Sequence, residues 1–413
     1  MTLAEDARAI ATRWTADMDL VALISQRLRE GALPGGSVDL VAIGKASLEM
    51  ALAARTVLKG RIHREFVVSD HGAQHGEAAG TVLIGEHPVP GEGSLNAGRA
   101  VVSFLERDDL ADTTLFLISG GASSLCVAPA PPLSLSDLSE VWDAALQSGV
   151  DITTLNQIRA SCSLIAGGAL LRYVRSTRST SLILVDNVVS GAPWVASAMT
   201  YDFLPSVSEI DTLWSKVDVD SSLRRKMLDA FGERSKVMAG RPSPIHQNVV
   251  VGEPAMMLRF AIEEAGRRGY RVVNMGSRVI GDVRSVSQEW GKVVRSGENR
   301  TAVIGVGEVT VQVQGDGVGG RCQEFAWLMA RELSGERNSA FVAQTSDGRD
   351  FVEGVGGAWV TNVTAAHTDA AGLDWLAVAD FHDTYPALRA LGQLIEGHHT
   401  GWNLADIYVA LVG

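Results

Sequence analysis

Two positively charged residues stand beside glycines where an apolar run gives way to a helical pattern. Lys45 follows the apolar run 38–44 in "AIGKAS", and Arg321 follows the glycine-rich run 315–320, "GDGVGG". Glycine lets the main chain turn sharply and come close to a ligand. The N–H groups at a helix start favour an anion, and a lysine or arginine adds a full positive charge. Both places suggest anion binding, while a solvated lysine and a plain turn remain the alternatives.

A third glycine turn lies in "LISGGASSL", residues 117–125, where an apolar run ends and small hydroxylic residues open a helix. Gly120, Gly121 and Ser123 have in outline the character of a phosphate cradle. The segment lacks the lysine of a P-loop and the spacing of a GxGxxG fingerprint. Close packing of a helix on a strand is the competing interpretation.

Acidic and histidine side chains occupy further predicted strand ends. Asp186 ends the apolar run "LILVD", His87 precedes Pro88, and Asp347 lies in "TSDGRD". A carboxylate at the end of a buried strand must be solvated, paired or bound to a metal such as Mg²⁺. Asp347 has a simpler alternative, because Asp-Gly readily forms a turn stabilised by its own side chain.

The elements that would position these residues alternate between short apolar runs and helical patterns. We expect strands at 38–44, 64–70, 80–86, 112–120 and 179–187. Strands alternating with helices predict an α/β fold with a parallel sheet covered on both faces. Ligands of such sheets bind beyond the carboxyl ends of the strands, which is where the charged residues and glycines fall.

A proline-rich break, "RPSPIHQ" at 241–247, is the expected boundary between a domain of residues 1–240 and one of residues 241–413. After it we expect a βαβ unit over 248–276 and two strands in 300–315 that turn near Gly305. The last helices are expected to pack in part on the first domain.

The composition limits the class of partner. The chain has 413 residues, a net charge of −12 and a pI near 5.3, and no basic run stands out, which argues against nucleic acid and anionic membrane. The three cysteines, Cys126, Cys162 and Cys322, show no metal or disulfide spacing, so a reducing cytoplasm is expected. No signal peptide or membrane span is predicted. The expected partners are small molecules, and the chain is expected to be a monomer or a homodimer.

Several segments together resemble one family, the glycerate 2-kinases of the type that carries a MOFRL domain. The matching segments occur in the family's order over almost the whole chain. They are "AIGKAS", "HPVPGEGSLNA", "LISGGASSL", "LNQIRASCSLIAGG", "NVVVGEPAMML", "GVGEVTVQVQGDGVGGRCQEFA" and "TSDGRD" with the following "GVGGA".

The resemblance implies an active site in a cleft between a Rossmann-like doubly wound N-terminal domain and a smaller C-terminal α/β domain. It implies transfer of the γ-phosphoryl of ATP, with Mg²⁺, to a hydroxyl of glycerate. Lys45 and Arg321 would flank the phosphoryl and carboxylate groups, and Asp186 would hold Mg²⁺ or orient the hydroxyl, with Asp347 as a second metal ligand. The remaining residues implied to bind phosphate or substrate are His87, Gly120, Gly121, Ser123, Asn156, Arg159, Glu308, Gln323 and Asp347.

The chain departs from the family pattern at several charged positions. Ala160 and Ala166 replace basic residues, Cys322 replaces an asparagine, Gly354 replaces an aspartate, and no second acid follows Asp186. One hypothesis is an altered acceptor, larger or less anionic than glycerate, such as a sugar acid, a polyol or a cyclitol. The alternative is a diverged paralogue that binds a nucleotide or metabolite without catalysis. A nicotinamide dehydrogenase is disfavoured, because no GxGxxG follows the first strand.

Overall fold

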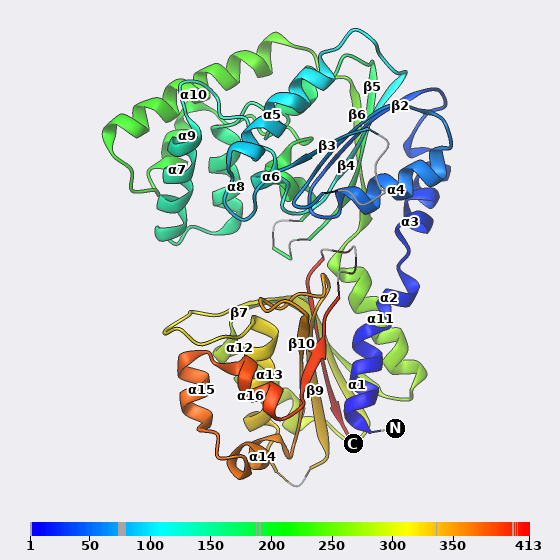
Figure 1. The fold of residues 1–413 in the computed structure, drawn as a ribbon, viewed down its shortest axis with the longest axis vertical. Coiled ribbons are helices and arrows are strands. Elements are labelled where there is room, and N and C mark those ends of the chain that lie inside the picture. The colour runs from blue at the N-terminus through cyan, green and yellow to red at the C-terminus, as the bar shows by residue number, and fades with distance from the viewer. Residues whose placement is uncertain are drawn as a thin grey trace. The chain divides into compact units, whose positions relative to one another are not determined.

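The structure is a computed structural model that describes residues 2–72, 80–186, 188–189, 191–335, 337–398, 400, 402 and 404–413. The chain forms two compact units, each with its own sheet (Figure 1). Residues 20–252 form what we call the N-terminal unit. Residues 1–19 and 253–413 form the C-terminal unit.

The N-terminal unit has a parallel sheet of six strands in the order β3-β2-β1-β4-β5-β6. The strands are β1 (Val38–Ile43), β2 (Ile62–Ser69), β3 (Thr81–Ile84), β4 (Thr113–Ile118), β5 (Arg178–Leu184) and β6 (Ile245–Gly252). Every residue of the two central strands β1 and β4 is buried, as expected for strands covered on both faces. The predicted Rossmann-like sheet is therefore confirmed.

Helices cover both faces of this sheet, with α3 and α4 on one face and the other helices on the opposite face (Figure 1). They are α3 (Leu20–Arg27), α4 (Ser47–Leu58), α5 (Glu92–Leu105), α6 (Ala122–Leu125), α7 (Leu135–Gln147), α8 (Ile152–Ser161), α9 (Val207–Trp214) and α10 (Ser221–Gly240), with 3₁₀ segments η2 (Ala169–Tyr173) and η3 (Ala192–Ala198).

The C-terminal unit has a mixed sheet of six strands in the order β11-β10-β9-β12-β8-β7, in which β7 and β8 are parallel and the other pairs antiparallel. The strands are β7 (Arg271–Asp282), β8 (Thr301–Thr310), β9 (Ser339–Thr345), β10 (Val355–Thr361), β11 (Leu394–Glu396) and β12 (Asp406–Val412). The helices are α1 (Leu3–Thr12), α2 (Trp14–Asp17), α11 (Pro254–Arg267), α12 (Val283–Ser296), α13 (Arg321–Glu332), α14 (Thr364–Ala370), α15 (Trp375–Phe381) and α16 (Thr384–Ala390).

The boundary between the units differs from the predicted one. The chain passes from one unit to the other at Gly252–Glu253, because β6 pairs with β5 and so completes the N-terminal sheet. β6 and β7 therefore belong to different sheets, and the expected βαβ unit is wrong. The helix α1 packs on β9 and β12, which places the first residues in the C-terminal unit, and the last helices stay in that unit as well.

The expected turn near Gly305 is also wrong, because β8 runs without interruption from Thr301 to Thr310. A Cβ on Gly305 would lie 2.7 Å from a methyl carbon of Val279, and one on Gly307 would lie 1.9 Å from the Val279 carbonyl oxygen. These glycines allow close approach of the neighbouring strand β7 rather than a change of direction.

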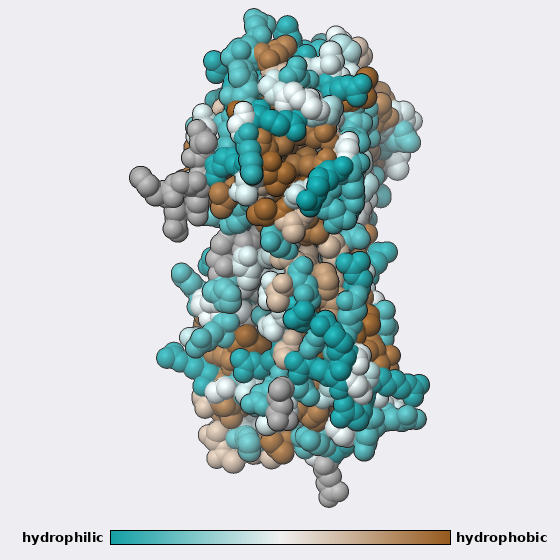
Figure 2. Space-filling model, turned by 90° about the vertical axis from the view of Figure 1, so that its right-hand side faces the viewer, coloured by the Kyte–Doolittle hydropathy of each residue, from teal (hydrophilic) through white to brown (hydrophobic). Residues whose placement is uncertain are grey.

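Hydrophilic side chains cover much of both units on the face shown in Figure 2, with smaller hydrophobic patches between them. A search of the described helices finds none with the length and apolar character needed to cross a bilayer.

Candidate active site

The ends of β1 and β4 are tied together by the turn that carries Lys45. The Lys45 N–H donates to the carbonyl oxygen of Gly120 at 2.9 Å, and the Ala46 N–H donates to Ser119 Oγ at 3.1 Å. Gly44 has a φ of +132°, and a Cβ there would lie 2.2 Å from Ser119 Oγ. Only glycine fits this turn, and the result is a half-buried Lys45 held at the carboxyl edge of the sheet.

Gly121 forms the floor under two predicted site residues. It has a φ of +83°, and a Cβ there would lie 3.0 Å from Lys45 Cγ and 3.3 Å from His87 Cδ2. Lys45 and His87 therefore pack over the space that a larger residue would fill. The helix that follows, α6, is a single turn of four residues, so charge at this place comes from side chains rather than from a long helix dipole.

A chain of hydrogen bonds joins three polar side chains beside this floor. Ser123 Oγ lies 2.8 Å from Ser197 Oγ, and Ser197 donates to Asn156 Oδ1 at 3.2 Å. Ser197 lies within a run of three left-handed residues, with φ of 55°, 50° and 60° at positions 196–198. Such a run in residues other than glycine costs energy and is typical of functional sites. The sequence "ASA" gives no signal for it, so Ser197 was not predicted.

Arg159 is a second cation of this cluster. Its guanidinium lies 4.4 Å from the centre of the Trp142 ring, and its Nε is buried without a hydrogen-bond partner. Burial lowers the pKa of Arg159 to about 10, which leaves it charged at neutral pH. Neither Lys45 nor Arg159 forms an ion pair with any residue in the described part of the chain. Two cations without a counter-ion therefore lie close to the Gly121 floor.

Burial and the positive charges of Lys45 and Arg159 all lower the pKa of His87. Burial of its ring, followed by the positive charge of Lys45 and a smaller effect of Arg159, lowers the pKa of His87 to about 4, although Asp70 opposes the shift. His87 is therefore neutral at pH 7. Asp186, half-buried just beyond β5, is the predicted acid of this unit. We call Lys45, His87, Gly121 and Arg159, with the Ser123, Asn156 and Ser197 chain, the N-terminal cluster.

Arg321, the cation of the C-terminal unit, is already paired. Its guanidinium donates two hydrogen bonds to Asp406, at 2.6 and 2.9 Å, and Nη1 lies 3.0 Å from Glu308 Oε1. Asp406 is fully buried. Burial by itself lowers the pKa of Arg321, but the two carboxylates outweigh it and raise the pKa. Asp406 was not predicted, although an acid directly before the apolar run "IYVALV" is a usable signal.

The glycine run before Arg321 is explained by the start of α13. Asp350 accepts hydrogen bonds from the N–H groups of Cys322 and Gln323, at 3.1 and 2.8 Å, and from Gln323 Nε2 at 3.1 Å. A Cβ on Gly320 would lie 2.2 Å from Asp350 Cγ. Burial raises the pKa of Asp350 to about 6. Gln323, predicted to bind substrate, here holds Asp350 at the helix start.

Asp347 forms the turn that the sequence left open as an alternative. Its Oδ1 accepts a hydrogen bond from the Arg349 N–H at 2.9 Å. Across the described ranges, no group of three or more His, Cys, Asp or Glu residues is arranged to hold a metal ion.

Comparison with known proteins bears on the family of the chain. The family described as a domain of unknown function, DUF4147, matches residues 5–232, and the MOFRL family matches residues 301–406. D-glycerate 2-kinase of Thermotoga maritima is 29% identical over 95% of each chain. The chain belongs to the glycerate 2-kinase family with a MOFRL domain. The resemblance inferred from its motifs is thereby confirmed.

Two further comparisons extend this result. The crystal structure of a glycerate kinase from Thermotoga maritima has a TM-score of 0.86 and 26% identity, and covers 100% of this chain and 99% of that one. A putative hydroxypyruvate reductase of Agrobacterium vitis is 30% identical over 92% of this chain and 88% of its own length. The names given to relatives of this chain therefore differ in the reaction that they state.

Within this family, the chain's own departures fall next to Arg159. Ala160 is fully buried, and Ala166 is 5% exposed. Ala166, Arg159, Ser123 and Ser197 line a small cavity of about 20 Å³. Such a volume holds about one water molecule. The space beside Arg159 is therefore both small and without a second cation.

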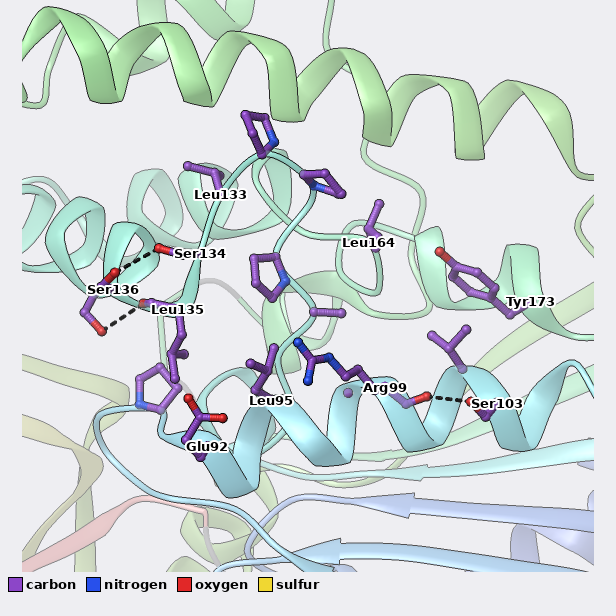
Figure 3. A pocket seen from close by; sticks show the side chains of 18 residues that line it. Glu92, Leu95, Arg99, Ser103, Leu133, Ser134, Leu135, Ser136, Leu164 and Tyr173 are labelled. Atoms are coloured by element: carbon purple, nitrogen blue, oxygen red, sulfur yellow. Dashed lines mark hydrogen bonds between the residues drawn. The ribbon is translucent and has the colours of Figure 1, made fainter.

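A larger cavity lies elsewhere in the N-terminal unit, and none of the predicted site residues lines it. It measures about 1000 Å³, between α5 and the segment before α7. Figure 3 shows Leu95, Leu133, Leu164 and Tyr173 around it, with one basic residue, Arg99. Mostly apolar walls do not suit a polyphosphate or a hydroxy acid, so we place the candidate site at the N-terminal cluster in spite of the smaller space there.

Proposed function

We propose that this protein transfers the γ-phosphoryl group of ATP to a hydroxyl of glycerate or a related hydroxy acid. The observation that carries the proposal is the pair of cations beside the Gly121 floor, Lys45 and Arg159, neither of which forms an ion pair with another described residue. Anionic reactants are the ligands that such a place attracts, and membership of the glycerate 2-kinase family gives the reaction class.

The proposed chemistry needs positioning and positive charge rather than a covalent intermediate. Phosphoryl transfer spreads negative charge over the oxygens of the moving group, and fixed cations stabilise this charge. We assign that role to Lys45. Arg159 holds a carboxylate or phosphate, and the chain through Ser123, Ser197 and Asn156 offers hydroxyl and amide groups to a reactant.

Arg321 and Gln323, the predicted site residues at the start of α13, have a different proposed role. The positive charge of Arg321 is neutralised by its ion pairs with Asp406 and Glu308. We therefore propose that Arg321 holds Glu308 and the glycine loop in place, and that it does not bind the phosphoryl group alone. Gln323 acts through Asp350 in the same way. Both residues are thus proposed as positioning residues.

Mg²⁺ stays a proposed cofactor, with Asp186 and Asp347 as the candidate carboxylates. Magnesium usually binds through one or two carboxylates together with nucleotide phosphates, and either acid alone could supply one such carboxylate. Bound there, the metal would supply charge neutralisation for the phosphates. Asp347 keeps its second carboxylate oxygen outside the turn hydrogen bond.

The proposed identity of the acceptor is based on the residues around Arg159. The place of a family lysine is taken by Ala166, which removes one positive charge from the acceptor side. We propose that sugar acids or neutral polyols compete with glycerate as acceptors. The protein is proposed to act in the cytoplasm, where its three buried, unpaired cysteines would stay reduced.

Reduction of hydroxypyruvate, the reaction in the name of one relative, has less support. A nicotinamide dinucleotide in this type of sheet binds on a glycine fingerprint after the first strand. Here the turn after β1 is Gly44-Lys45-Ala46-Ser47, which lacks that spacing.

The test is a phosphorylation screen of the purified protein with ATP, Mg²⁺ and a panel of glycerate, longer sugar acids and neutral polyols. ADP formation that depends on the acceptor is expected, with hydroxypyruvate and NADH as the parallel assay. The absence of any acceptor-dependent ADP formation would overturn the proposed kinase activity. It would favour the alternative of a diverged paralogue that binds a nucleotide or metabolite without catalysis. Faster turnover of glycerate than of every other acceptor would overturn the proposed change in acceptor only.

A further inference from the structure

The C-terminal unit contains a cavity of its own at the start of α13. It measures about 310 Å³, which is the lower end of the range for small-molecule sites. Its lining residues are Val311, Val313, Gly317, Gly319, Gly320, Arg321, Glu324, Asp350, Phe351 and His382. All of them belong to this one unit, and we call this space the α13 cavity.

Two buried polar side chains of the α13 cavity each have one atom that makes no hydrogen bond within the described residues. Glu324 is 2% exposed and His382 is 7% exposed. The atoms are Glu324 Oε1 and His382 Nδ1, which face each other at 3.4 Å, within ion-pair distance when His382 is protonated. Buried polar atoms in native proteins are almost always paired, so two neighbouring exceptions indicate a ligand that supplies the missing bonds.

The other polar groups of the cavity are already engaged. Arg321 is bound to Asp406 and Glu308, and both oxygens of Asp350 accept hydrogen bonds from the first turn of α13. A ligand therefore meets one acceptor, Glu324, directly beside one nitrogen, the Nδ1 of His382, which donates when it carries hydrogen.

The mouth of the cavity is apolar and contains an aromatic ring held in an uncommon conformation. Phe351 is 73% exposed and has a φ of +63°, and Val313 is 69% exposed. A bulky residue in the left-handed region is strained, and strain of this kind concentrates at ligand sites. The exposed ring of Phe351 and the exposed Val313 both line the cavity and offer apolar surface to a flat ring.

The geometry points to a nucleobase, the adenine of ATP, as the ligand of the α13 cavity. The exocyclic amino group would donate to Glu324 Oε1, a neighbouring ring nitrogen would accept from His382 Nδ1, and the ring would stack on Phe351. This inference rests on the proposed function for the presence of ATP, and adds the residues that select its base.

Other ligand classes fit the α13 cavity less well. A divalent cation needs more ligands than Glu324 and His382, and the described residues contain no metal-binding group of three. A phosphate group would meet the carboxylate of Glu324 and an Arg321 that is already neutralised. An apolar mouth with one adjacent acceptor and donor is the usual arrangement for a heteroaromatic ring.

The experiment measures binding of nucleoside diphosphates by calorimetry without any acceptor. We expect the wild type to bind ADP at least about tenfold more tightly than purine riboside diphosphate, which has the same ring without the amino group. In Glu324→Met, which keeps the side-chain size but has no acceptor oxygen, the two affinities should become equal within about threefold. In Phe351→Ala both nucleotides should bind about tenfold more weakly, because base stacking is lost.

Phe381→Ala is the matched control, since Phe381 is 57% exposed in the same unit and does not line the cavity. Its ADP affinity should equal that of the wild type. Unchanged ADP affinity in folded Phe351→Ala, or tighter binding of GDP than of ADP by the wild type, would overturn the assignment. A wild type that binds ADP as expected but phosphorylates no acceptor would overturn the proposed function and leave this inference standing.

Discussion

Lys45 and Arg321 have the same kind of sequence context, a cation beside glycines at a helix start, but they are in opposite electrostatic situations. Lys45 has no ion pair within the described residues, whereas Arg321 has two carboxylate partners. The sequence supports both as anion-binding residues, because a buried partner such as Asp406 lies 85 residues further along the chain. Only the fold shows that Arg321 is neutralised.

Replacing Arg321 should therefore harm stability more than a surface arginine would. Arg321→Ala leaves the buried Asp406 without its cation, and we expect a loss of roughly 3–5 kcal/mol in the free energy of unfolding. Arg331→Ala, an exposed position on the same helix, should cost less than about 1 kcal/mol. Urea unfolding measures both, and adding Asp406→Asn to Arg321→Ala should recover part of the loss. Equal stability of the two single variants would show that the pair contributes nothing.

Gly121 offers a sharper test of the N-terminal cluster. Gly121→Ala places a methyl group against Lys45 and His87, and we expect kcat to fall about tenfold or more because the lysine must move. Gly149→Ala is the matched control, since Gly149 also has a positive φ, of +65°, but nothing within 4 Å of the added carbon. Both changes should lower stability by similar amounts, while only Gly121→Ala lowers kcat. Similar kcat values for the two would contradict the packing of Lys45 over Gly121.

At the scale of elements, the predictable part of the structure is the part set by local pattern. The apolar runs placed β1, β4 and β5 correctly to within two or three residues, and with them the turns that carry Lys45 and Gly121. The sequence predicts a turn at Gly305 and Gly307, because a glycine needed for the close approach of a neighbouring strand looks the same in sequence as a glycine needed for a bend. Ser197 could not be found, because its left-handed conformation follows from packing around it.

The start of α13 should give the C-terminal unit a characteristic dependence on pH. Burial raises the pKa of Glu324 to about 7; the positive charge of Arg284 opposes this shift, and the charges of Asp282 and Asp380 add to it. Glutamate exposed in the unfolded chain loses its proton near pH 4.5. Between pH 4.5 and pH 7 the folded protein therefore keeps a proton on Glu324 that the unfolded chain has lost. The free energy of unfolding falls as the pH rises from about 4.5 to about 7.

We expect Glu324→Gln to remove this dependence. The variant should gain about 2–3 kcal/mol relative to the wild type between pH 5 and pH 8, as measured by urea unfolding at each pH. Glu289→Gln, an exposed glutamate on α12, should show no such change and serves as the control. A stability difference between Glu324→Gln and the wild type that is constant with pH would mean that Glu324 is ionised throughout.

At the scale of the whole molecule, the sequence motifs predict the family. The division into two units depends instead on which distant strands pair with one another. The predicted boundary at residue 240 stopped short of β6, whose place beside β5 depends on pairs such as Arg178 with Ile245, far apart in the sequence. The first helix joins the C-terminal sheet for the same kind of reason. Sequence motifs mark residues near a site well, but they do not say which distant segment completes a sheet or neutralises a charge.

The central claim is that Lys45 stabilises the transferred phosphoryl group, and the most direct test is the kcat of Lys45→Ala with glycerate, ATP and Mg²⁺. Lys236→Ala, an exposed lysine of the same unit, is the control. We expect kcat to fall at least about 100-fold in Lys45→Ala and to stay unchanged in Lys236→Ala, as for the loss of a group that stabilises transition-state charge. A folded Lys45→Ala protein with kcat within about threefold of the wild type would contradict the claim.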